Sequence, residues 1–247
     1  VERFQQIVAS GFELVEASPQ TLVTFGVQPS FPSTGYGYLE LGAPTGRGAR
    51  LVERFHEKPD ESTARCYFEA GPDRYLWNSG MFVWRADTLM DCVRRFAPHN
   101  YAGLSEIARH AGSAGLEQAA ARVYPALPKI SVDYAVMEPA SRDSAVRVAA
   151  LPMDLRWLDI GSWATFSATC PKDERGNALA AAERVLHETT DTLVYSSDPG
   201  HLVAVAGVEG LIVVHTPDAT LVCRADQSEA VKQLQQVVAA RFGGRHL

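Results

Sequence analysis

The chain has 247 residues, a formal net charge of −6 at pH 7 and a hydrophobic content of 46%. This composition is sufficient for a buried core and excludes an intrinsically disordered polymer. No run of Lys and Arg stands out, which argues against a nucleic-acid-binding protein. No apolar stretch approaches the roughly 20 residues that cross a bilayer, so the expectation is a cytoplasmic protein without a membrane partner.

The cysteines and histidines do not follow a metal-binding spacing. The four cysteines are far apart with no C-x-x-C pair, and the seven histidines include no H-E-x-x-H arrangement. Reduced thiols are expected, and a dedicated zinc site is not.

Strands and helices are expected to alternate up to about residue 175. Apolar residues at helical spacing open the chain. Strands are then predicted at 21–25, 36–41, 51–57, 81–84 and 145–151. Helices are predicted at 60–70 with Asp60 as cap, at 87–96, at 100–124 and from Ser162 onward. This alternation is typical of an α/β layered domain with a largely parallel sheet.

The pattern changes between residues 172 and 184, where a domain boundary is placed. We therefore predict one domain at 1–175 and a second at 176–247. Short β-rich runs follow at 192–196, 202–207, 211–216 and 219–223, and a last helix covers 227–242. Their spacing is consistent with a small β-sandwich, barrel or coil.

Two motifs lie beside predicted strands in the first half of the chain. Gly35-Tyr36-Gly37-Tyr38 would let backbone approach a ligand, but the spacing is not that of a dinucleotide loop, and on this motif alone a plain turn is favoured. Glu57 and Lys58 end a strand, where ligands bind in open α/β sheets. Glu57 can accept hydrogen bonds from hydroxyls, and Lys58 suits a phosphate. An exposed ion pair before a helix is the alternative.

Three further motifs carry polar residues. Asn78, in WNSG, can donate and accept hydrogen bonds at once, which suits a hydroxyl ligand; an Asx turn is the alternative. Asp159, in WLDIGSW, could hold a divalent cation or serve a helix N-terminus. In SVDYAVME, Ser131 is expected to cap a short helix, and Asp133 could support the site from behind.

Together and in this order, the motifs resemble one protein family. TGYGYLELG, FHEKPD, LWNSGMFVWR, SVDYAVME and WLDIGSW are similar to bacterial mannose-1-phosphate guanylyltransferases (GDP-mannose pyrophosphorylases), over about Thr21 to Leu221. The resemblance implies a Rossmann-like nucleotidyltransferase domain of the glycosyltransferase-A type. It also implies a small left-handed β-helix after that domain.

Carried over by position, the resemblance implies a sugar site in the first domain. Mannose hydroxyls would be held by the backbone near Tyr36 and Gly37 together with Glu57 and Asn78. Lys58 would meet the sugar phosphate.

The resemblance also implies the reaction and its metal. Family members join GTP and mannose 1-phosphate into GDP-mannose and pyrophosphate, and Asp159 would coordinate the Mg²⁺ cofactor. Lys58 and Asp159 are thus the expected catalytic residues.

The family's first nucleotide-binding motifs, G-G-x-G-x-R-L-x-P and S-D-H, are absent from the sequence. The nucleotidyltransferase domain is therefore expected to be truncated at its N-terminus, and the chain alone is expected not to catalyse the reaction.

Two alternatives stay open. One is the same chemistry on another hexose 1-phosphate, such as glucose 1-phosphate. The other is a non-catalytic regulatory or oligomerisation module, which predicts no Mg²⁺ site and uses Asp159 only as a helix cap. A homodimer through the β-rich part is suggested by analogy alone.

Overall fold

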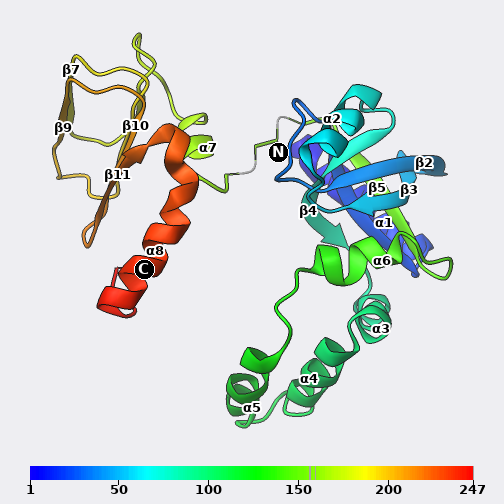
Figure 1. Cartoon of the computed structure of the whole chain (residues 1–247). Helices are drawn as coiled ribbons and strands as arrows, with labels where there is room; N and C mark the ends of the chain where they lie inside the picture. Colours follow the sequence, from blue (N-terminus) through cyan, green and yellow to red (C-terminus); the bar gives the residue numbers. More distant parts are fainter. Residues whose placement is uncertain (156, 159, 247) are drawn as a thin grey trace. The chain divides into compact units, whose positions relative to one another are not determined.

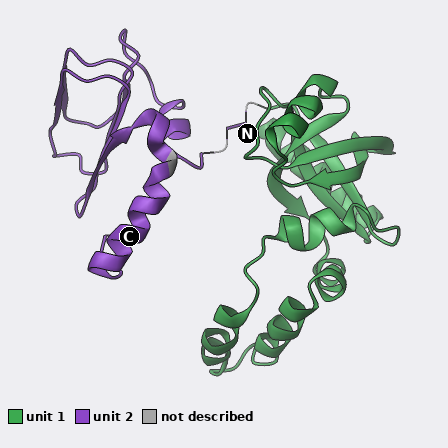
Figure 2. Ribbon diagram, viewed as in Figure 1, with its two compact units in different colours: residues 1–156 green, residues 157–247 purple. Residues whose placement is uncertain are grey.

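The computed structural model describes residues 1–155, 157–158 and 160–246. The chain forms two compact units, residues 1–156 and 157–247 (Figure 2). The change of pattern near residue 175 therefore lies inside the second unit.

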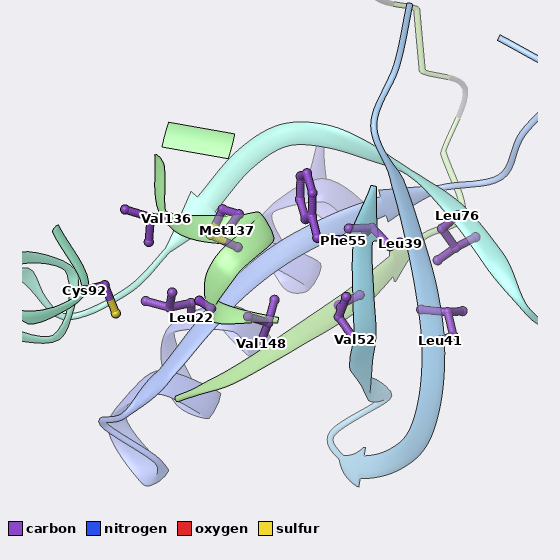
Figure 3. Close-up of a cluster of buried hydrophobic side chains, with 12 residues drawn as sticks. Leu22, Leu39, Leu41, Val52, Phe55, Leu76, Cys92, Val136, Met137 and Val148 are labelled. Atoms are coloured by element: carbon purple, nitrogen blue, oxygen red, sulfur yellow. The ribbon is translucent and has the colours of Figure 1, made fainter. Parts of the chain in front are cut away.

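The first unit is built around a five-stranded sheet that closes on itself (Figure 1). Its strands, in the spatial order β1-β4-β2-β3-β5, are β1 (Thr21–Val27), β4 (Tyr75–Val83), β2 (Tyr38–Gly46), β3 (Ala49–His56) and β5 (Arg147–Met153). Every residue of β1 is buried, as its continuous apolar run predicts. The core of the sheet includes Leu22, Leu39, Phe55, Met137 and Val148 (Figure 3).

The prediction of a largely parallel sheet is wrong. Only β1 and β5 pair in parallel, and the other four pairings in this sheet are antiparallel. One of these pairings, β2 with β3, follows from the Gly-rich stretch after Leu41, which is a tight hairpin. Gly46, Arg47 and Gly48 all have positive φ there, and such a short connection can join antiparallel strands only.

Helices cover and extend this sheet. Helix α1 (Glu2–Ala17) buries Ile7, Leu14 and Val15, and α2 (Glu61–Ala70) begins at Asp60, whose carboxylate accepts from Thr63 N at 2.8 Å as predicted. The remaining elements are α3 (Ala86–Phe96), α4 (Pro98–Ala108), α5 (Leu116–Val123), the 3₁₀ turn η1 (Tyr124–Ala126), the π-helical turn η2 (Asp133–Met137) and α6 (Glu138–Ala140).

The single helix expected at 100–124 is two helices. Gly112, with φ of +75°, and Gly115 lie between α4 and α5. Glycine at positive φ is favoured where a helix ends, because it has no Cβ to clash with the backbone.

The second unit is a β-helix-like coil followed by a helix. Strands β6 (Ala178–Ala180), β8 (Leu193–Ser196) and β10 (Leu211–His215) pair in parallel, and β11 (Thr220–Arg224) adds to β10 in an antiparallel sense. Strands β7 (Arg184–His187) and β9 (Val203–Ala206) form a parallel pair of their own. The chain thus alternates between two sheets, which confirms the coil among the three architectures that the sequence left open.

Helices flank the coil. α7 (Trp163–Ser167) begins at Ser162, which forms a capping box with Thr165. The last helix was predicted from residue 227, but a 3₁₀ segment, η3 (Ala225–Ala230), precedes α8 (Val231–Phe242). Within the described parts of the chain, no helix is both long and apolar enough to cross a membrane.

Candidate functional site

The strand ends of the first unit bring Gly37 and Glu57 together. Gly37 immediately precedes β2, Glu57 immediately follows β3, and the terminal residues Tyr38 and His56 of these strands are paired partners. A Cβ on Gly37 would lie 2.5 Å from Glu57 Oε2. The glycine therefore leaves room for the carboxylate, which is packed directly against the backbone.

Asn78 lies beside Gly37 and Glu57, at a rim formed by the start of β2, the end of β3 and the part of β4 that pairs with β2. The strand predicted at 81–84 begins earlier than expected, because β4 starts at Tyr75 and runs through the whole WNSG motif. Asn78 N donates to Gly37 O at 2.8 Å, which fixes Asn78 beside Gly37. The pairing of β1 with β4 shifts register between Thr24 and Gly26. Gly80, with φ of +73°, lies in the irregular part of β4, so this irregularity accommodates the motif.

Asp133 approaches the rim from the π-helical turn η2. Asn78 Nδ2 donates to Asp133 Oδ1 at 3.0 Å. The sequence suggested that Asp133 supports the site from behind, and this contact places it there. Ser131 does not cap the turn with its side chain as predicted; instead its carbonyl accepts from Ala135 N at 2.9 Å.

Thr24 was missed by the sequence reasoning. Its hydroxyl lies 2.7 Å from Asn78 Oδ1 and 3.2 Å from Met81 O, in the middle of the buried strand β1. The signal was a threonine within an otherwise apolar stretch of a buried strand, where a buried polar group needs a partner. The sequence could not show that this partner is Asn78, which is 54 positions away.

Lys58 and Glu57 form an ion pair at the opening of the site. Lys58 Nζ lies 3.1 Å from Glu57 Oε1, and the side chains are 54% and 7% exposed, respectively. Burial raises the pKa of the Glu57 carboxyl, and the hydrogen bond to Glu57 raises the pKa of Lys58. Lys58 also has φ of +45°, a sparsely populated backbone conformation of the kind that concentrates at ligand sites.

The side chain of Tyr36 belongs to a neighbouring aromatic group. Its ring lies 4.9 Å from Trp77 and 6.4 Å from Phe31, measured between centroids. Successive residues of a strand face opposite sides, so Trp77 points away from the side that Asn78 faces. For Tyr36, the expected contribution to ligand binding therefore rests on its backbone.

Asp159, the expected Mg²⁺ ligand, lies outside the described residues. The residues that are described contain no group of three or more His, Cys, Asp or Glu side chains placed to hold a metal ion. Mg²⁺ commonly takes only one or two protein carboxylates and fills its other positions with water and substrate phosphates. One carboxylate, that of Asp159, together with substrate phosphates and water would meet this requirement.

The structure thus gathers Gly37, Glu57, Lys58 and Asn78 at one rim. The site offers a buried carboxylate as acceptor, an amide, and an ammonium group at the solvent side. Acceptors and amides suit sugar hydroxyls, whereas an ammonium suits a phosphate. This arrangement can bind hydroxyl groups at the buried carboxylate and the amide, and an anion at the half-exposed ammonium group.

Two family models match the chain. The model described as "Nucleotidyl transferase" matches residues 3–176, and that described as "MannoseP isomerase/GMP-like beta-helix domain" matches residues 182–238. Both agree with the folds of the regions that they cover.

Curated relatives and one solved structure are similar over most of the chain. The xanthan biosynthesis protein XanB of Xanthomonas campestris pv. campestris (strain B100) is 38% identical, covering 86% of this chain and 43% of that protein. A mannose-1-phosphate guanylyltransferase of Klebsiella pneumoniae is 37% identical, covering 86% and 44%. The crystal structure of mannose-1-phosphate geranyltransferase from Thermus thermophilus matches with a TM-score of 0.75 and 31% identity, covering 96% and 65%.

These relatives confirm the resemblance drawn from the five motifs. The chain spans about half the length of the curated relatives that it matches.

Proposed function

Because the chain belongs to the nucleotidyl transferase family, we propose that it supplies the sugar-phosphate site of an enzyme that makes GDP-mannose and pyrophosphate from GTP and mannose 1-phosphate. The observation that carries this proposal is the convergence of Glu57, Lys58 and Asn78 on one strand rim. The family match supports the reaction class, and the named relatives support mannose 1-phosphate and GTP as substrates.

In this reaction a phosphate oxygen of mannose 1-phosphate attacks the α-phosphorus of GTP. An oxygen–phosphorus bond forms there, the bond from the α-phosphorus to the bridging oxygen breaks, and pyrophosphate leaves. The attacking oxygen is already anionic, so no general base is required, and the protein contributes alignment and charge.

The residues at the rim divide this work. Glu57 and Asn78 hold sugar hydroxyls and thereby set the direction of the phosphate. Lys58, whose ammonium group is half exposed, meets the phosphate and offsets its charge. Mg²⁺, held by Asp159 and substrate phosphates, would offset the repulsion between the two anionic substrates.

Calorimetric titration of the chain with mannose 1-phosphate, glucose 1-phosphate and inorganic phosphate tests the site. We expect saturable binding of mannose 1-phosphate that is tighter than binding of inorganic phosphate, and a loss of this difference in Glu57→Gln. Equal affinity for the three ligands, or no binding of mannose 1-phosphate, would reject the proposed sugar site.

The alternative substrates are separated by release of pyrophosphate from this chain joined to the family's nucleotide-binding segment, measured with GTP or ATP in combination with either sugar phosphate. Higher turnover of GTP with mannose 1-phosphate supports the proposal. Preference for glucose 1-phosphate or ATP would assign the chain to another branch of the same chemistry.

A further inference from the structure

We propose that Asp133 and Thr24 are positioning residues that set which way the Asn78 amide faces the sugar. This inference rests on the proposed function, because it concerns how the same site distinguishes hydroxyl donors from acceptors. It is carried by two hydrogen bonds at opposite ends of one side chain, 2.7 Å from Thr24 Oγ1 and 3.0 Å to Asp133 Oδ1.

The carboxylate determines the orientation of the amide. If the amide were turned over, its oxygen would face Asp133 Oδ1, and two acceptors would lie 3.0 Å apart without a proton between them. Only the NH₂ group can face the carboxylate favourably. The amide oxygen must then face Thr24, whose hydroxyl proton is directed to it over the shorter of its two contacts.

The fixed amide retains capacity for a ligand. An amide has two N–H donors and two oxygen lone pairs, and these two contacts occupy one of each. Among the described residues, no other side-chain contact of Asn78 is observed. One donor and one acceptor are therefore presented in known positions, and turning the amide would exchange them.

Asp133 is itself held in place by packing and by a neighbouring hydroxyl. Val136 and Met137 of the same turn are buried in the sheet core (Figure 3). Ser141, just beyond the turn, accepts from Phe55 N at 3.0 Å and donates to Glu138 O at 2.8 Å. These bonds tie the helical segment to the end of β3, two residues before Glu57, so Asp133 and Glu57 are positioned by the same anchor.

A purely structural role explains the choice of a carboxylate poorly. Asp133 lies close enough to Glu57 for its charge to raise the pKa of the Glu57 carboxyl, after the larger effect of burial. Two neighbouring carboxylates repel each other, and a neutral partner for Asn78 would avoid that repulsion. The negative charge of Asp133 fixes the orientation of the Asn78 amide, because a carboxylate can only accept a hydrogen bond. A neutral amide at position 133 could donate or accept, so it would tolerate both orientations of Asn78.

The test is a double-mutant cycle on the affinity for mannose 1-phosphate. Asp133→Asn should weaken binding at least about twofold, because an amide that can face either way is competent to bind only part of the time. In the Asn78→Ala background, the same substitution should have little further effect, because the residue acts through the amide. An equal loss in both backgrounds, or no loss in either, would overturn the proposal.

Control variants separate positioning from damage to the fold. Asp143→Asn removes a partly buried carboxylate that pairs with Arg95, away from Asn78, and should leave the affinity unchanged. Thr24→Val should weaken binding, whereas Thr24→Ser, which keeps the hydroxyl, should restore it. If Thr24→Ser weakened mannose 1-phosphate binding as much as Thr24→Val, the role given to the hydroxyl would be contradicted.

A second readout does not depend on the ligand, so failure of the proposed function can be recognised separately. In a ¹⁵N-labelled sample, the Asn78 side-chain amide should give two well-separated proton signals, one shifted by the bond to the carboxylate. In Asp133→Asn the shift caused by the carboxylate should be lost, or the pair should appear twice because both orientations of the amide are populated. An unchanged pair in the variant would overturn the positioning role, whereas absence of mannose 1-phosphate binding in the wild type would reject the sugar site alone.

Discussion

Asn78 in the first unit is half-buried and Asn177 in the second is buried, and the hydrogen bonds of their side chains differ. Asn177 is fully buried, and its amide donates to Thr189 O at 2.9 Å and to Asp173 Oδ2 at 3.0 Å. Its Oδ1 accepts from Thr192 N at 3.1 Å. Both amide hydrogens are used inside the coil, two of its three contacts being with backbone.

In the described part of the chain, the side-chain amide of Asn78 has side-chain partners only, and they occupy half of its capacity. The comparison separates two uses of one residue type. An asparagine that satisfies neighbouring backbone supports the fold, whereas one that is oriented by side chains and retains free positions is suited to a ligand.

The largest effect is expected where the asparagine supports the fold. Asn177→Ala should lower the free energy of unfolding by about 3 kcal/mol, because it leaves the carbonyl of Thr189 and the N–H of Thr192 without their partner. Urea unfolding followed by circular dichroism measures this. Asn100→Ala, which removes one exposed bond to Pro128 O, is the control and should change the free energy by under about 1 kcal/mol. A loss of equal size in both variants would break the comparison.

Removing the ammonium group at the rim should affect binding more than folding. Lys58→Ala is expected to weaken mannose 1-phosphate binding at least tenfold, since it removes the cation facing the phosphate and leaves the Glu57 carboxylate unpaired. Calorimetry measures the affinity, and Lys129→Ala, at an exposed lysine elsewhere in the first unit, is the control. Unchanged affinity in Lys58→Ala would reject the phosphate role.

A single methyl group at Gly37 should disturb the site without unfolding the sheet. Gly37→Ala would place a Cβ 2.5 Å from Glu57 Oε2, so the carboxylate must move. We expect several-fold weaker binding of mannose 1-phosphate and little change in the urea midpoint, because the displaced atom is at the end of a flexible side chain. Gly35→Ala is a matched control, since its Cβ meets only Ser33 Oγ at 3.6 Å. Equal affinities in the two variants would contradict the packing of Glu57 on Gly37.

The smallest effect is a pH dependence. Burial is the main cause that raises the pKa of Glu57 above its ordinary value of 4.5. As the pH falls through this raised pKa, the carboxylate gains a proton and loses an acceptor for the sugar. The ratio of wild-type to Glu57→Gln affinity should therefore fall on acidification at a pH above 4.5. Taking the ratio cancels the titration of the ligand phosphate, and a ratio that stays constant from neutral pH down to the ordinary carboxyl range would contradict the assignment.

The same raised pKa has a consequence for stability. The folded protein holds the Glu57 proton more tightly than the unfolded chain, so this contribution to stability is present below the unfolded pKa and is lost as the pH rises through the folded pKa. Binding and stability should thus respond to this group in opposite directions over the same pH window.

Much of the site could be predicted because it is local in sequence. Glu57 and Lys58 lie at the end of one predicted strand, and Gly37 lies near the start of another, so their place at the strand ends follows from the pattern. Asp60 as a helix cap and the short strands of the second unit were likewise readable from their neighbours.

What could not be predicted depends on partners that are distant in sequence. The pairing of Thr24 and Asp133 with Asn78 spans 54 and 55 positions, and no local pattern encodes it. The antiparallel sheet was missed for the same reason, since alternation of strands and helices does not specify which strands become neighbours. Asp159 stays a prediction from the family resemblance.

The central claim, that Gly37, Glu57, Lys58 and Asn78 form one sugar-phosphate site, is tested most directly by mapping the ligand on the chain. A ¹⁵N-labelled sample is titrated with mannose 1-phosphate, and the amide signals are followed. The account predicts that the largest shifts fall on these residues and on the Asn78 side chain, and that they saturate with a single dissociation constant. Shifts confined to the β-helix-like unit, or signals at the rim that do not move at saturating ligand, would contradict it.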